Sequence, residues 1–86
     1  MLKIAQVGVG YWGPNILRNL IANKRCRVTT AVDLAAERRE YVRSMYPAIR
    51  VSDNVDEVFQ DPQTDAVVIA TPVASHFDLC VKALEA

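Results

Sequence analysis

The chain lacks several features that would assign it to a common class of protein. Its 86 residues carry ten Lys and Arg against ten Asp and Glu, so the formal net charge is zero. A balanced chain has no excess positive charge with which to bind a nucleic-acid backbone. The longest clean apolar run, residues 66–70, is far shorter than the ~20 residues that span a bilayer. The first residues also lack the apolar stretch and cleavage site of a signal peptide. We therefore expect one cytoplasmic domain that binds neither nucleic acid nor a membrane.

Cysteine and histidine are equally scarce. Cys26 and Cys80 have no second cysteine or histidine at metal-ligand spacing, and His76 is the one histidine. This pattern excludes a disulfide framework, and we predict no metal site. Both thiols are expected to be reduced and non-catalytic, Cys80 because it falls on the apolar face of a predicted helix.

What the chain does contain is a regular alternation of strand and helix patterns. The unbroken apolar run Ala66 to Ile69 is typical of a strand that is covered on both faces in a parallel sheet. Strands are predicted at residues 2–7, 27–32, 49–52 and 66–69, and helices at 14–23, 35–45, briefly after 54, and from about 75 to the last residues. This order predicts an α/β fold, with a doubly wound parallel sheet.

Finer predictions concern the helices. Capping-box spacing is expected to start a helix at Asn54, with Glu57, and another at Ser75, with Asp78. The buried stripe of the second helix is predicted to comprise Leu34, Tyr41, Val42 and Met45, and that of the last helix Phe77, Cys80, Val81 and Leu84.

The three glycines of the chain lie in one motif, Gly8-Val-Gly10-Tyr-Trp-Gly13. Gly8 permits a tight turn after the first strand, Gly10 lets a diphosphate approach the backbone, and Gly13 lets the helix pack on the strand. The first N–H groups of the helix then face the diphosphate. A plain strand-to-helix turn is the alternative, and the context argues against it.

The context of the glycine motif includes an acidic residue directly after the second predicted strand. Asp33 follows Gly13 by 20 positions, close to the ~20 expected for the residue that binds the adenosine ribose. A carboxylate there accepts hydrogen bonds from the ribose hydroxyls and repels a 2′-phosphate, so NAD is favoured over NADP. Asp33 could also be the N-cap of the second helix. Arg38 and Arg39 could meet a 2′-phosphate, but they lie far into the helix and are better explained as its solvated face.

Together these residues resemble the N-terminal domain of Gfo/Idh/MocA oxidoreductases. The resemblance rests on Gly8 to Asn15, on Asp33, and on the stretch Asp65-Ala-Val-Val-Ile-Ala-Thr71-Pro72-Val-Ala-Ser-His76. It covers the whole chain. It implies a Rossmann-type sheet of strand order 3-2-1-4 and a nicotinamide-dependent dehydrogenase acting on a sugar, sugar-nucleotide or polyol carbon.

The resemblance also implies that residues 1–86 are a partial N-terminal dinucleotide-binding domain. Family members continue into a Glu-Lys-Pro motif, whose lysine is catalytic, and a C-terminal substrate domain. No catalytic residue is therefore assigned in this chain, which we expect to be inactive alone, and the full enzyme is expected to be a homo-oligomer. The cofactor-binding candidates are Gly8, Gly10, Tyr11, Trp12, Gly13, Asp33, Thr71, Pro72 and His76.

Several of these candidates have open alternatives. Tyr11 and Trp12 could cover the diphosphate or stack beside the nicotinamide, or they could pack on a neighbouring helix or the second domain. Thr71 and Pro72 are expected to line the cofactor cleft. His76 could lie beside the cofactor, although a helix-start residue that bonds local backbone is the favoured interpretation, since no acid or nucleophile is spaced to complete a catalytic set.

Two other functions are alternatives to the dehydrogenase. A stand-alone dinucleotide-binding or sensor module would share all of these features without catalysis. An S-adenosylmethionine methyltransferase ranks last, because such loops rarely carry the third glycine at this spacing. We also expect self-association through Ala66–Ala70, a strand at the sheet edge with no Lys, Pro or charge to prevent pairing.

Overall fold

Four parallel strands form the centre of the molecule. The computed structural model describes residues 2–10, 13–71 and 73–85, the last range with side chains from Leu79 onward. The strands are β1 (Leu2–Val7), β2 (Cys26–Val32), β3 (Arg50–Ser52) and β4 (Ala66–Ile69), in the order β3-β2-β1-β4. The predicted fold class and strand order are therefore confirmed.

The register brings the carboxyl ends of the four strands level with one another. Val7 pairs with Val32 on one side and with Ile69 on the other, and Val32 pairs in turn with Ser52. The loops that follow these residues consequently leave the sheet along one edge. In open α/β sheets this is the edge where ligands bind.

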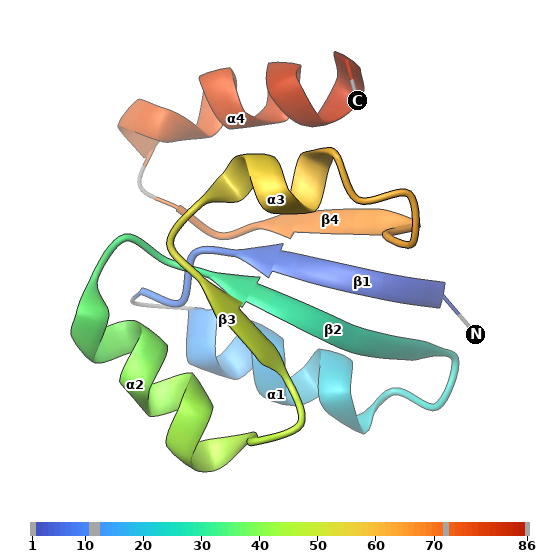
Figure 1. Cartoon of the computed structure of the whole chain (residues 1–86), viewed down its shortest axis with the longest axis vertical. Coiled ribbons are helices and arrows are strands. Elements are labelled where there is room, and N and C mark those ends of the chain that lie inside the picture. Colours follow the sequence, from blue (N-terminus) through green and yellow to red (C-terminus); the bar gives the residue numbers. More distant parts are fainter. Residues whose placement is uncertain (1, 11–12, 72, 86) are drawn as a thin grey trace.

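Two helices cover each face of the sheet (Figure 1). The helices are α1 (Gly13–Ala22) and α2 (Ala36–Met45) on one face, and α3 (Val55–Phe59) and α4 (Val73–Glu85) on the other. The first core contains Leu17 of α1 and Val42 of α2, both fully buried, and the second is built around Val58 of α3. No helix in the described part of the chain has the length and hydropathy needed to cross a membrane.

The buried stripe predicted for the second helix is largely wrong. Of its members only Val42 is buried, whereas Leu34 is 87%, Met45 56% and Tyr41 37% exposed. Leu34 precedes the helix, which begins at Ala36. Because β3 is a three-residue edge strand, α2 packs on a narrow part of the sheet. Val42 alone of the predicted stripe is therefore buried between them.

The capping predictions are also corrected in part. Asn54 does cap α3, since its side chain accepts the N–H of Asp56 at 3.0 Å. Glu57 does not complete the box, because its carboxylate accepts the Ser52 hydroxyl at 2.8 Å instead. Helix α4 begins at Val73, so Ser75 lies inside it and is not the N-cap. A spacing of three residues also joins neighbours on one helix face, so it does not by itself mark a helix start.

The apolar runs at the end of the chain are less covered than predicted. All residues of β4 are half-buried rather than buried, because β4 has a strand neighbour on one side only. On α4, Cys80 and Val81 are half-buried, Leu84 is 88% exposed, and the side chain of Phe77 lies outside the described residues. The other predicted boundaries agree with the structure to within one residue at each end.

Candidate functional site

The first glycine of the motif is where the loops after β1 and β4 touch. Gly8 has a φ of +96°, a conformation that side-chain-bearing residues rarely adopt. A Cβ at this position would lie 2.5 Å from the carbonyl oxygen of Ala70 and 2.9 Å from the Cγ2 methyl of Thr71. The backbone N–H of Gly8 donates to the carbonyl of Val32 at 2.7 Å. Glycine is therefore required here by the protein itself, both for φ and for space.

The other two glycines differ in what surrounds them. A Cβ on Gly13 would lie 3.0 Å from the carbonyl oxygen of Gly8, so this glycine lets the start of α1 pack tightly on the loop. Apart from its chain neighbours, no atom of the described residues would lie within 4 Å of a Cβ on Gly10. The space beside Gly10 is consequently open, as close approach of a diphosphate to this backbone requires.

Gln6 is a residue of this site that the sequence analysis missed. Its side chain is fully buried, and its Nε2 donates to the carbonyl of Gly8 at 3.0 Å and to that of Gly13 at 2.9 Å. One amide group thus joins the two ends of the glycine loop. Its Oε1 has no hydrogen-bond partner among the described residues. The available signal was an uncharged polar side chain within the apolar segment from Ile4 to Val7, two residues before the first glycine.

Asp33 reaches from the end of β2 to the glycine loop. Its Oδ2 accepts the N–H of Val9 at 2.8 Å, and its Oδ1 accepts the N–H of Ala35 at 2.9 Å. An ionised carboxylate has about four acceptor positions, and the described residues use two of them, which leaves two for ribose hydroxyls. The half-buried side chain therefore fits both a structural role and a ligand.

The alternative role of Asp33 is corrected by the helix boundary. The N-cap of α2 is Ala35, which has no side-chain cap, and Asp33 lies two residues before it. Its bond to the Ala35 N–H closes a turn of the Asx type, in which an aspartate bonds the backbone two residues on. Asp33 thus shapes the approach to α2 without capping it.

Arg39 lies nearer to this site than its position in the helix suggested. Its Nη1 donates to the carbonyl oxygens of Asp33 and Leu34, each at 2.9 Å. The prediction that Arg39 belongs to a solvated helix face is therefore wrong, and Arg39 is half-buried, whereas Arg38 is exposed as predicted. A long side chain on the first turn of a helix can reach back to the carbonyls that precede it, which residue spacing alone does not reveal.

The remaining candidates come from the loop after β4. Thr71 lies against Gly8, and its Oγ1 is buried with no hydrogen-bond partner among the described residues. His76 belongs to the first turn of α4, but its side chain lies outside the described residues. Tyr11, Trp12 and Pro72 also lie outside them. The structure thus brings Gly8, Gly13, Asp33 and Thr71 together around one loop.

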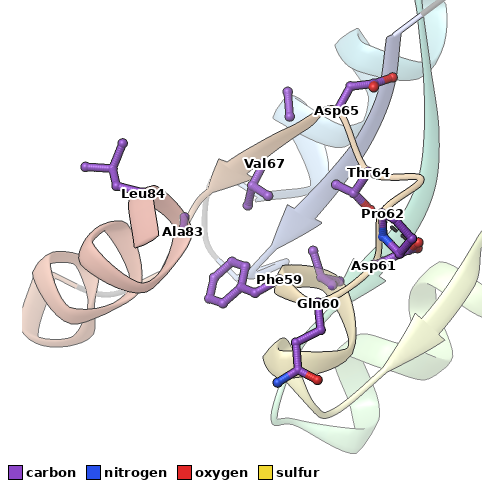
Figure 2. A pocket seen from close by; sticks show the side chains of 11 residues that line it. Phe59, Gln60, Asp61, Pro62, Thr64, Asp65, Val67, Ala83 and Leu84 are labelled. Atoms are coloured by element: carbon purple, nitrogen blue, oxygen red, sulfur yellow. Dashed lines mark hydrogen bonds between the residues drawn. The ribbon is translucent and has the colours of Figure 1, made fainter. Parts of the chain in front are cut away.

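A separate groove opens at the other end of β4 (Figure 2). It has a volume of about 800 Å³, and Phe59, Val67 and Leu84 provide much of its apolar lining. The start of β4 and the end of α4 form its sides, with Asp65 beside them (Figure 2). Because the glycine loop lies at the carboxyl ends of the strands, this groove is not the candidate cofactor site.

Comparison with known proteins identifies the family of the chain. Residues 2–86 match the model of an oxidoreductase family with an NAD-binding Rossmann fold. A scyllo-inositol 2-dehydrogenase (NAD(+)) of Bacillus subtilis is 31% identical over 85 residues, which are 98% of this chain and 25% of that protein. The chain spans about a quarter of the length of the curated relatives that it matches.

Solved structures show the same fold. A myo-inositol dehydrogenase of Lactobacillus casei, in complex with NAD(H) and myo-inositol, superposes with a TM-score of 0.90 at 25% identity over 100% of this chain and 26% of that one. An NAD-binding protein of Listeria innocua has a TM-score of 0.88 at 31% identity, over 98% of this chain and 24% of that one. With the family model matched from the first strand to the last helix, the chain belongs to the oxidoreductase family with an NAD-binding Rossmann fold.

Proposed function

We propose that this chain binds NAD at the carboxyl edge of its sheet, with the glycine loop on the diphosphate and Asp33 on the adenosine ribose. The observation that carries the proposal is the 2.8 Å hydrogen bond from the Val9 N–H to the Asp33 carboxylate. Because of this bond Asp33 lies directly beside the loop that would hold the diphosphate, which supports its assignment to the ribose. The open space at Gly10 and the two unused acceptor positions of Asp33 fit the same cofactor.

The residues of the chain hold and orient the cofactor in this proposal, and the nicotinamide ring supplies hydride transfer when it is bound. The first N–H groups of α1, at the positive end of its dipole, stabilise the diphosphate charge. Asp33 accepts the ribose hydroxyls and repels a phosphate at the 2′ position, so NAD is preferred to NADP. Thr71 lies where the loop after β4 meets Gly8, and we assign it to the wall of the cleft. The roles of Tyr11, Trp12, Pro72 and His76 stay predictions.

For the whole protein we propose a dehydrogenase that acts on the carbinol or carbonyl carbon of a sugar, sugar nucleotide or polyol. The support is that two of the three relatives described above, those of Bacillus subtilis and Lactobacillus casei, are named as inositol dehydrogenases. These names favour an enzyme over a stand-alone sensor module. In this proposal residues 1–86 provide the N-terminal cofactor-binding part, while the catalytic lysine and the substrate domain belong to other parts of the protein. A cytoplasmic location stays a prediction.

Calorimetric titration of the 86-residue chain with NAD and with NADP tests the cofactor proposal. We expect weak binding with a preference for NAD, and loss of that preference in Asp33→Ala. Equal affinity of the unmodified chain for both dinucleotides would show that Asp33 serves only the turn before α2. If sugars or polyols reduced NAD in the presence of this chain alone, the assignment of the catalytic groups to other parts of the protein would be wrong.

We further propose that the 86-residue chain self-associates through β4. The support is that β4 pairs with β1 on one side only and that Ala66–Ala70 carries no charge or proline. A second copy could add its own β4 antiparallel and form one continuous two-fold sheet. The homo-oligomeric state of the full protein stays a separate prediction.

Sedimentation at several concentrations tests this association. Ala70 donates its N–H to Val7 of β1 at 2.7 Å, so in a regular ladder the N–H of Val68 also faces β1, and that of Val67 faces the open edge. Val67→Pro is therefore expected to reduce association while the fold is kept, and Val68→Pro is expected to weaken the fold itself. A strictly monomeric chain at high concentration would refute the proposal.

A further inference from the structure

Arg39 holds unused hydrogen-bond donors beside the predicted ribose site. Its Nη1 supplies the two bonds to the carbonyls of Asp33 and Leu34. A guanidinium has five N–H donors, so three remain on Nη2 and Nε. Among the described residues, none of these three takes part in a hydrogen bond or ion pair. A fixed positive charge with free donors therefore lies against the turn that carries the ribose-binding acid.

Two further donors meet at the carboxylate of Asp33. The N–H groups of Val9 and Ala35 point at it from the glycine loop and from the start of α2. While the carboxylate is ionised, it uses both donors and repels a phosphate on the 2′ oxygen of the ribose. If the charge of this carboxylate is removed, the groups around it leave a positive potential. They are the two backbone N–H groups and the Arg39 guanidinium, which bonds the backbone carbonyl of the same residue.

We propose that Arg39 is a latent ligand for a 2′-phosphate, so that the preference for NAD depends on the charge of Asp33 alone. This rests on the proposed function, since it assumes that the ribose lies beside Asp33. Arg39 is a specificity-determining residue in this account. Its planar guanidinium suits a phosphate, with which it can form two parallel bonds.

The experiment measures dissociation constants of NAD and NADP by calorimetry, at one ionic strength, for Asp33→Asn and for two double variants. Asn keeps the size of the side chain and one oxygen acceptor for the turn. We expect Asp33→Asn to raise the affinity for NADP relative to NAD by at least tenfold. Adding Arg39→Gln is expected to abolish most of that gain and to change NAD binding by less than twofold.

Arg38→Gln is the matched control in the same background. Arg38 is the neighbouring arginine on α2, and it is exposed; its backbone N–H donates to the carbonyl of Ala35, but its side chain makes no hydrogen bond to the turn among the described residues. If long-range charge alone attracts the 2′-phosphate, the Arg38 and Arg39 changes will lower NADP affinity equally, and the proposal is wrong. It is also wrong if the gain for NADP survives Arg39→Gln.

Folding and the parent proposal are checked separately. Thermal unfolding by circular dichroism shows whether Asp33→Asn keeps the fold, because Asp33 accepts two backbone N–H groups. If it does not fold, Asp33→Ser, which also removes the charge and keeps one oxygen acceptor for the turn, replaces Asp33→Asn in all three chains. There we again expect a gain of NADP affinity that Arg39→Gln abolishes and Arg38→Gln does not, and a gain that survives Arg39→Gln would overturn the proposal. If the unmodified chain binds neither dinucleotide, the proposed function itself has failed.

Discussion

Replacing Gly8 by alanine in one variant and Gly10 in another should change different properties. The first change should lower the stability of the fold, and the second should lower the affinity for NAD. In Gly8→Ala the new Cβ would lie 2.5 Å from the carbonyl oxygen of Ala70, and the residue would be held at a φ of +96°. The unfavourable backbone conformation costs about 1–2 kcal/mol. Relief of the overlap adds about 1–3 kcal/mol, because the overlapping atoms are backbone atoms of Ala70, directly after β4, and the backbone has to move.

The sum, roughly 2–5 kcal/mol, is a large part of the ~5–15 kcal/mol that stabilises a typical small protein. In Gly10→Ala the Cβ would have no described residue other than its chain neighbours within 4 Å. We therefore expect the free energy of unfolding to stay the same or to rise by up to ~1 kcal/mol, because alanine restricts the unfolded chain. Its methyl group would instead occupy the space assigned to the diphosphate, and NAD affinity should fall at least tenfold.

Urea unfolding followed by circular dichroism measures the first effect, and calorimetry with NAD measures the second. A shift of the urea midpoint without a change of slope would show that stability alone has changed. The reasoning is refuted if Gly8→Ala is as stable as the unmodified chain. It is also refuted if Gly10→Ala binds NAD with unchanged affinity, since the open space beside Gly10 would then have no part in binding.

Three other substitutions and one control, Leu84→Ala, test the remaining structural arguments by thermal or urea unfolding. Gln6→Leu should cost about 2–4 kcal/mol, because it leaves the buried carbonyls of Gly8 and Gly13 without their donor, and a neutral result would mean that water replaces the amide. Leu17→Ala should cost about 2–5 kcal/mol since the side chain is fully buried, whereas Leu84→Ala, at a side chain 88% exposed, should change stability by less than ~0.5 kcal/mol. Asn54→Ala should cost about 0.5–2 kcal/mol through loss of the α3 cap, and no change would show that this cap is dispensable.

Side-chain bonds made across a turn of the chain explain two of the errors of the sequence analysis. Gln6 follows an apolar pair in the strand, and only the return of the chain at Gly13 shows what its amide bonds. Arg39 reads as a solvated helix residue until the turn at Asp33 folds back beneath it. The stripe predicted for α2 was too wide because helical periodicity does not show how little sheet β3 offers.

The sequence by itself determined the alternation of strands and helices, the class of sheet and the positions of the glycines and of Asp33. These follow from local rules, namely apolar periodicity, turn chemistry and the conformational freedom of glycine, which act over a few residues. The tertiary structure alone decided which groups meet at the glycine loop. The Asp33 carboxylate reaches Val9 because parallel pairing sets Val7 level with Val32. Thr71 lies at Gly8 because Val7 is also level with Ile69. Register is set by the hydrophobic pattern where apolar and polar residues alternate, but the apolar run of residues 66–70 has no such alternation, so the sequence of β4 does not specify its register by itself.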